Sequence, residues 1–81
     1  MQVDEEMYQQ YAAYVYKYLL SMTGNKDIAE EITQETFYQA IRSINKFDGS
    51  CKLGTWLCSI AKNQLAVYRK KKIRQPILSK I

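Results

Sequence analysis

The strongest constraint on the fold is the spacing of apolar residues between Thr55 and Lys72, which follows the period of an α-helix. The apolar side chains of this stretch fall on one side of a helical projection: Leu57, Ile60, Ala61, Leu65 and Tyr68. The opposite side holds Thr55, Ser59, Lys62, Ala66 and Arg69. Because an amphipathic helix buries its apolar side against other elements, the pattern predicts a helix packed on a small core.

A second helix is predicted from Asp4 to Thr23, where Gly24 provides a natural stop. Its apolar residues also recur every three or four positions: Tyr8, Tyr11, Ala12, Val15, Tyr18, Leu19 and Met22. Tyr14 and Tyr16 fall off this stripe. Five tyrosines in one helix indicate a half-buried surface whose hydroxyls reach water or a partner.

Between these two helices, a further helix is predicted from Asp27 to about Asn45. Asp27 is placed as its N-cap because Glu30 follows three residues later, as in a capping box. The residues expected to face inward are Ile28, Ile32, Phe37, Ala40, Ile41 and Ile44.

The stretch 46–54 forms a predicted nine-residue loop, longer than most helix–helix connections, and long loops are more often functional. The helix that follows is expected to fade near 73–75, because Pro76 disfavours helix just before it. With no β-alternation and 81 residues, the chain is predicted to be one all-α domain. It should form a small bundle of three long helices, the first either continuous or split in two, with a functional loop before the last.

Charge divides the chain into two unlike halves, although the net charge is only +4. Residues 1–48 hold four Lys/Arg and eight Asp/Glu, and residues 49–81 hold eight Lys/Arg and no acid. This asymmetry suggests two different partners, one of them polyanionic. A nucleic acid and an anionic membrane surface both fit the basic half.

Several function classes are disfavoured by residues that the chain lacks. No apolar run approaches the roughly 20 residues of a membrane span, and the N-terminus is acidic, so a cytoplasmic protein without membrane insertion is expected. Cys51 and Cys58, seven residues apart, match no zinc spacing and are expected to be reduced thiols. Since the chain has no histidine, phosphate loop or nucleophile motif, we expect no enzyme activity, metal or cofactor.

Two surfaces carry candidate binding residues. Trp56, Asn63 and Lys70 recur every seven residues along one helix edge, where an indole, an amide and a cation suit a nucleic acid. The alternative is a buried Trp, a solvated Asn and a solubilising Lys. The second surface lies on the preceding helix and comprises Glu31, Gln34, Glu35 and Tyr38. It is either simply solvated or a docking surface for a basic partner.

The segments AEEITQETFYQAIRSINKF and TWLCSIAKN together resemble region 2 of bacterial sigma factors, especially the extracytoplasmic-function (ECF) group. That group commonly reads AED-x-x-QETF and, after a loop, W-L-x-x-IA-[RK]-N. The similarity covers roughly residues 4 to 75. Either segment alone is a weak signal, but both in this order are a strong one.

The resemblance implies a role for each surface. Glu31, Gln34 and Glu35, with Tyr38 beside them, would dock on the clamp coiled coil of the RNA polymerase β′ subunit. The following loop and helix would read the promoter −10 element, mainly as single-stranded non-template DNA. The implied base-reading residues are Phe47, Asp48, Gly49, Ser50, Cys51, Lys52, Leu53, Trp56 and Asn63. Basic side chains would contact phosphates: Lys46, Lys62, Arg69, Lys70 and Lys71. An anti-sigma factor is a further implied partner.

The chain departs from the family pattern at the end of the last helix. Where the family continues N-x-x-x-D-x-x-R, this chain has Val67 and Lys70, and Arg69 is the nearest substitute for the missing arginine. By this resemblance, residues 1–75 form the region 2 domain and 76–81 begin an interdomain linker. Two alternatives without the family role are a generic basic helical module that binds nucleic acid or membrane by charge, and a regulatory interaction module.

Overall fold

The structure, a computed structural model, describes residues 5–79, and for residues 72–79 it describes the backbone only. It consists of α1 (Glu5–Thr23), α2 (Lys26–Ser43), the short 3-10 helix η1 (Ile44–Lys46) and α3 (Leu53–Ser79). No strand occurs in this part of the chain. The predicted all-α class is confirmed, and the first helix is continuous.

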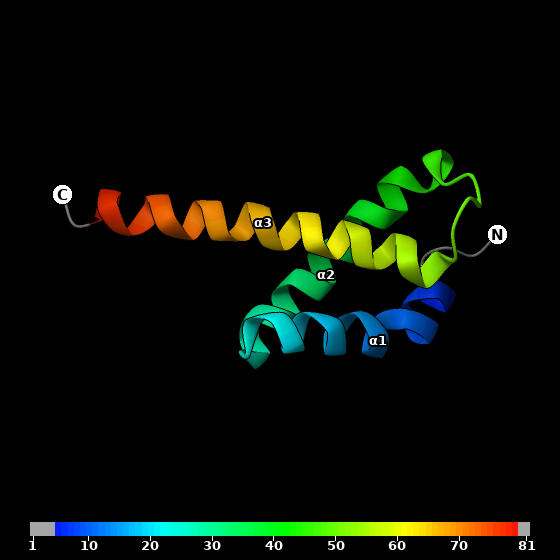
Figure 1. The fold of residues 1–81 in the computed structure, drawn as a ribbon, viewed down its shortest axis with the longest axis horizontal. Helices are drawn as coiled ribbons and strands as arrows, with labels where there is room; N and C mark the ends of the chain where they lie inside the picture. Colours follow the sequence, from blue (N-terminus) through cyan, green and yellow to red (C-terminus); the bar gives the residue numbers. More distant parts are fainter. Residues whose placement is uncertain (1–4, 80–81) are drawn as a thin grey trace.

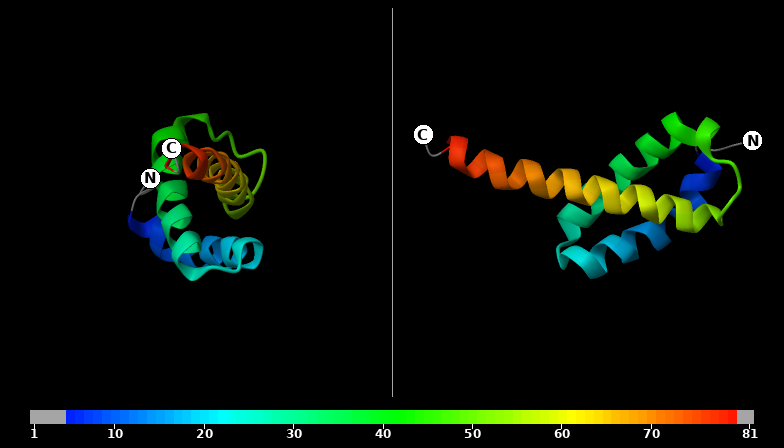
Figure 2. Two further views of the ribbon diagram at one scale, coloured as in Figure 1. Left: turned by 90° about the vertical axis from the view of Figure 1, so that its left-hand side faces the viewer. Right: turned by 45° about the horizontal axis from the view of Figure 1, so that its top comes forward.

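The three α-helices pack pairwise against one another (Figures 1 and 2). α1 runs below α3, and α2 passes behind α3 (Figure 1). The C-terminal part of α3 extends beyond the other helices (Figure 1). A 27-residue helix is about 40 Å long at the usual rise per residue, which accounts for most of the 48 Å length of the molecule. Within residues 5–79, no helix is both long and apolar enough to cross a membrane.

The core is built from apolar side chains of all three helices: Met7, Val15, Leu19, Ala29, Ile32, Phe37, Ala40, Leu57, Ala61 and Leu65. The predicted apolar side of α3 is confirmed, since Leu57, Ala61 and Leu65 are buried. Ile60 and Tyr68 pack against the margin of the core. The predicted polar side of α3 is exposed throughout.

The burial of α1 agrees with the predicted stripe only in part. Val15 and Leu19 are fully buried, but Tyr8 and Met22 are exposed to 42% and 37%. Tyr16, predicted to lie off the stripe, packs against the core, and Met7, which the stripe left out, is buried in the core. The predicted stripe is too narrow because α1 contacts both α2 and α3, and its buried surface is therefore wider than one helical row.

The start of α2 differs from the prediction. Asn25, rather than Asp27, is the N-cap, and its Oδ1 accepts a hydrogen bond from the backbone N–H of Ile28 at 3.0 Å. Gly24 precedes it with φ +66°, a left-handed conformation that ends α1 and that a glycine adopts without strain. α1 and α2 are therefore joined by only two residues.

The inward side of α2 contains two threonines that the prediction left out. Thr33 and Thr36 are buried, and each hydroxyl donates to the backbone carbonyl four residues earlier, Ala29 and Ile32 respectively, at 2.7 Å. Ile41 was predicted to face inward but is 43% exposed. The predicted end near Asn45 also differs from the structure, because α2 ends at Ser43 and is followed directly by the 3-10 helix η1.

Both predicted limits of α3 need correction. The helix begins at Leu53, because the Trp56 backbone N–H donates to the Lys52 carbonyl at 3.0 Å. The irregular loop is therefore limited to 47–52. The helix also passes Pro76 and ends at Ser79, so the expected fading near 73–75 was wrong. A proline disfavours helix in the residue before it but does not exclude it; the last two residues of the expected linker, 80–81, lie outside the described part.

Candidate functional site

The four residues of the predicted docking face lie on one exposed side of α2. This face, defined as Glu31, Gln34, Glu35 and Tyr38, is solvent-accessible at every position. The Gln39 side chain donates a hydrogen bond to Glu35 Oε2 at 3.1 Å. The Arg42 guanidinium lies 5.5 Å from the centroid of the Tyr38 ring, within the range of a cation–π contact. These contacts hold both side chains against α2 while leaving the face open.

A groove of about 180 Å³ runs between α2 and α3 beside this face. Its lining residues come from both helices: Glu31, Ile32, Glu35, Gln64, Val67, Tyr68 and Lys71. The α2–α3 groove combines two carboxylates and one ammonium group, that of Lys71, with apolar side chains, of which Val67 is 44% exposed at the α3 side. A partner with a basic and an apolar side chain side by side would match this surface.

The loop 47–52 is shaped by a turn in which an aspartate side chain accepts a hydrogen bond from the backbone two residues later. Asp48 Oδ1 accepts a hydrogen bond from the Ser50 backbone N–H at 2.9 Å, and Gly49 between them has φ +80°. Hydrogen bonds from the backbone and side chain of Ser50 lower the pKa of the Asp48 carboxyl. Residues 48–52, which form the loop tip, are all exposed.

The two ends of the loop are anchored by aromatic and apolar contacts. Phe47 and Trp56 are both half-buried, and their ring centroids are 4.9 Å apart with an interplanar angle of 37°. Leu53 and Trp56 pack against the core. Trp56 therefore contacts both the core and the loop residue Phe47. The alternative in which Trp56 is simply a buried core residue is correct in part.

The structure places the three residues of the predicted reading edge, Trp56, Asn63 and Lys70, on one line along α3. Successive members are seven residues apart, which corresponds to about 10 Å along a helix. Asn63 and Lys70 are exposed, whereas Trp56 is half-buried. The amide and the cation are thus free to reach an extended ligand, and the loop lies near the Trp56 end.

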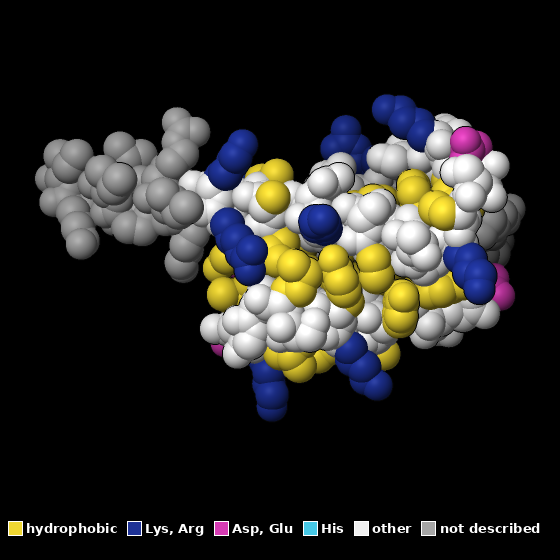
Figure 3. Space-filling view, viewed as in Figure 1, with side chains coloured by type: hydrophobic (Ala, Val, Ile, Leu, Met, Phe, Trp, Pro, Cys, Tyr) yellow, Lys and Arg dark blue, Asp and Glu magenta, His cyan; other side chains and the backbone are white. Residues whose placement is uncertain are grey.

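The predicted phosphate-binding cations do not form one cluster. Lys62 and Lys70 are exposed on α3, and Lys46 is exposed at the end of η1. Lys71, by contrast, lines the α2–α3 groove together with Glu31 and Glu35. Figure 3 shows Lys and Arg side chains distributed along α3 with apolar side chains in the seam between α3 and α1.

Arg69 has an intramolecular role that the sequence did not reveal. Its Nη2 donates a hydrogen bond to the carbonyl of Met22, in the last turn of α1, at 3.3 Å. A cation at a helix C-terminus is favoured by the helix dipole. Arg69 therefore links α3 to the end of α1, and its contact with phosphate stays a prediction.

The two cysteines are free thiols in different surroundings. Cys51 is exposed at the loop tip, and Cys58 is half-buried on α3. Burial raises the pKa of the Cys58 thiol, which a hydrogen bond with the Tyr14 side chain offsets in part. A raised pKa means less thiolate at neutral pH, so Cys58 is suited to packing rather than to redox chemistry.

Three residues near the site were not among the predicted site residues. Gln64 and Val67 line the α2–α3 groove, which no single-helix pattern reveals because it needs two helices side by side. Gly54 lies in the first turn of α3, where an added Cβ would come within 3.2 Å of Tyr14 Cε2. The absence of a side chain there lets the start of α3 approach α1 closely.

Residues 7–75 match the family described as Sigma-70 region 2. The chain is 40% identical over 75 residues to the ECF RNA polymerase sigma factor SigM of Bacillus subtilis, covering 93% of this chain and 45% of that protein. It is 41% identical over 61 residues to the ECF RNA polymerase sigma factor BldN of Streptomyces coelicolor, covering 74% and 23%. The ECF RNA polymerase sigma factor SigX of Bacillus subtilis is 34% identical over 74 residues, covering 89% and 38%.

The chain thus spans less than half the length of these curated relatives. No solved structure gives a significant match to it.

Proposed function

The chain belongs to the sigma-70 region 2 family, and from this premise we propose that it is the part of an ECF sigma factor that docks on RNA polymerase and engages the promoter −10 element. The observation that carries the proposal is the placement of two unlike surfaces on one helical bundle. The acidic docking face lies on α2, and the loop 47–52 with the reading edge lies at η1 and α3.

The docking face is suited to a basic protein surface such as the proposed clamp coiled coil of the β′ subunit. Glu31 and Glu35 are exposed, one helical turn apart, and the α2–α3 groove beside them offers apolar side chains. Charged groups at such a surface steer association and fix the register of the partner. An anti-sigma factor that covered this face would prevent docking, and we propose one as a regulatory partner.

The loop and α3 are suited to a single DNA strand rather than to a duplex. Reading a duplex by a helix needs several base-contacting side chains in the major groove. The reading edge offers one amide, Asn63, beside one half-buried aromatic side chain, Trp56. That set fits an exposed strand in which one or two bases are held individually, with one base turned out toward the loop 47–52.

The docking proposal is tested by the charge reversal Glu35→Lys. We expect the variant to lose co-purification with core RNA polymerase, because it places like charges at the contact. Glu5→Lys, the same change at an exposed position of α1, serves as the matched control and should bind as the wild type does. Circular dichroism checks that both variants remain helical. Retained binding by Glu35→Lys would show that the docking face is misassigned.

The loop cysteine gives a second test, of whether DNA binding depends on redox state. Cys51 is exposed, and the proposed mechanism does not use its thiol chemically. Cys51→Ser should therefore leave binding to promoter DNA nearly unchanged. A large loss of binding in this variant, or redox-dependent binding of the wild type, would instead make the loop a sensor. Fluorescence anisotropy with a labelled single strand, in reducing and oxidising buffer, measures both.

A further inference from the structure

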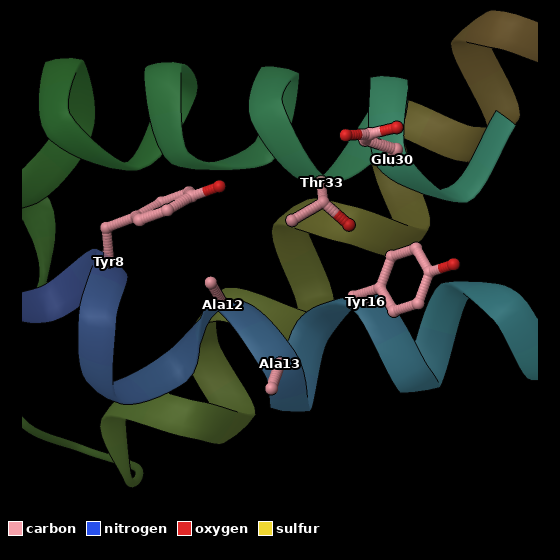
Figure 4. A pocket seen from close by; sticks show the side chains of 6 residues that line it. All are labelled: Tyr8, Ala12, Ala13, Tyr16, Glu30 and Thr33. Atoms are coloured by element: carbon pink, nitrogen blue, oxygen red, sulfur yellow. The ribbon is translucent and has the colours of Figure 1, made fainter. Parts of the chain in front are cut away.

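A second hollow lies between α1 and α2, away from the docking face and the loop. It has a volume of about 320 Å³ and is lined by Tyr8, Ala12, Ala13, Tyr16, Glu30 and Thr33. Figure 4 shows the two tyrosines rising from α1 on either side of the small alanine side chains, with Glu30 and Thr33 on α2. We call this hollow the α1–α2 notch. None of its lining residues belongs to the docking face or the reading edge.

The walls of the notch are held in place by the core. The Tyr8 ring meets the Phe37 ring edge-on, with centroids 5.0 Å apart and an interplanar angle of 71°, and Phe37 is buried. Tyr16 packs against the core with part of its ring. The Thr33 hydroxyl donates its hydrogen to the Ala29 carbonyl, so only the acceptor capacity of its oxygen is left for a ligand. The two alanines leave space where larger side chains would fill the notch.

The chemistry of the notch favours a cation. Aromatic faces attract guanidinium and ammonium groups, and phenol oxygens accept their hydrogen bonds. Glu30 adds an exposed carboxylate at the rim. The half of the chain that builds the notch, residues 1–48, holds eight acidic and four basic residues, so an anionic ligand such as a DNA phosphate is disfavoured.

We propose that the α1–α2 notch binds an arginine side chain displayed by a protein partner. Arginine fits better than lysine because its planar guanidinium stacks on aromatic rings and donates to a carboxylate at the same time. The notch is a shallow, open hollow, whereas sites for small molecules enclose most of their ligand. The occupant is therefore a side chain carried on a partner's backbone, and this surface acts independently of polymerase docking.

The test uses the 81-residue chain and the peptide acetyl-Gly-Arg-Gly-amide, followed by ¹⁵N–¹H NMR titration. We expect the largest amide shift changes at residues that line the notch. The same peptide with citrulline in place of arginine, which keeps the shape and removes the charge, should cause much smaller changes. Equal responses to the two peptides, or changes centred on Glu31 and Glu35, would overturn the proposal.

Two matched variants assign the binding to the notch. Glu30→Gln should weaken the arginine peptide roughly two- to fivefold, the range expected when one exposed ionic contact is lost. Glu31→Gln, the same change one residue further along α2, should leave the affinity unchanged, because Glu31 lines the α2–α3 groove instead. Equal effects of the two variants would show general attraction to the acidic half and would contradict a defined site.

The aromatic contribution is tested separately from charge and from polymerase docking. Tyr16→Leu should also weaken the arginine peptide roughly two- to fivefold, the range of an exposed cation–π contact. Circular dichroism confirms that this variant is folded. Glu30→Gln should co-purify with core polymerase as the wild type does, so a failure of the docking proposal and a failure of this one give different results.

Discussion

At the scale of single residues, Asn25 determines where α2 begins. Its side chain accepts the Ile28 N–H, which would otherwise lack an intrahelical partner. Asp27, two residues later, is exposed in the first turn of α2. Its negative charge interacts favourably with the helix dipole there, but it is not the N-cap. Both residues suit the start of a helix, and the sequence alone favoured Asp27 because Glu30 completes a capping-box pattern.

The two residues should differ in their effect on stability. Asn25→Ala is expected to lower the free energy of unfolding by about 1 kcal/mol, the usual cost of losing a cap. Asp27→Ala should cost about 0.5 kcal/mol, since only a charge–dipole interaction is lost. Urea denaturation followed by circular dichroism measures both. A larger cost for Asp27→Ala than for Asn25→Ala would contradict the assigned cap.

The carboxyl group of Asp48 should report the turn at the loop tip through its pKa. Hydrogen bonds from Ser50 stabilise the ionised form, so the pKa in the folded chain lies below the ordinary value of 3.8. Because the folded-state pKa is lowered, ionised Asp48 favours the folded turn above the unfolded-state pKa, and this contribution disappears as the pH falls through the folded-state pKa. An NMR titration of the side-chain carboxyl carbon measures the midpoint, and a value at or above 3.8 would contradict this turn.

At the scale of elements, the apolar side of a helix is predicted more accurately when fewer neighbouring helices pack against that side. The apolar side of α3 was predicted correctly, with Leu57, Ala61 and Leu65 all buried. α1 was predicted less well, because its buried surface includes Met7 and part of Tyr16 outside one helical row. The start of α3 at Leu53 was also not predicted, because a glycine such as Gly54 is more typical of a loop than of a helix. In the structure, the missing side chain of Gly54 makes room for Tyr14.

The close approach at Gly54 gives an element-scale prediction. In a helix, Gly→Ala gains up to about 1 kcal/mol of stability when space allows. Here the added Cβ would lie 3.2 Å from Tyr14 Cε2, so Tyr14 must shift to accommodate it. We expect Gly54→Ala to be more favourable in a Tyr14→Ala background than in the wild type. Thermal unfolding of the four proteins of this double-mutant cycle measures the coupling, and strict additivity would show that α1 and α3 do not constrain each other there.

At the scale of the whole molecule, α2 connects the two proposed binding surfaces. Its exposed side carries the docking face, while its buried side supports α1 and α3, and the loop that follows η1 leads to the reading edge. The alignment of the residues in the docking face and in the reading edge could be predicted from the sequence because each set lies on a single helix, whereas their binding roles stay predictions. The α2–α3 groove, the α1–α2 notch and the Arg69 contact with Met22 could not, because each joins segments that only the tertiary fold brings together.

The division of the cations predicts which lysines act on DNA. Lys62→Ala should weaken the binding of all single-stranded sequences similarly and reduce the salt dependence, by about 0.7 in the slope of log K against log salt for one lost phosphate contact. Lys71→Ala should have a smaller effect, because Lys71 lines the α2–α3 groove together with Glu31 and Glu35. Anisotropy titrations at several salt concentrations measure both slopes. An effect of Lys62→Ala confined to particular sequences would contradict a phosphate contact.

The central claim is that the loop 47–52 and Asn63 read individual bases of a single strand. It is tested most directly with a fluorescent base analogue placed in turn at each position of the non-template −10 element, with core polymerase and either wild-type or Asn63→Ala protein. We expect the fluorescence to rise at one position, where a base leaves the stack, because unstacking relieves quenching. Asn63→Ala should reduce discrimination at one or two positions by roughly 1–3 kcal/mol. The absence of any brightening position, or a loss that is uniform over all sequences, would contradict base reading and leave binding by charge alone.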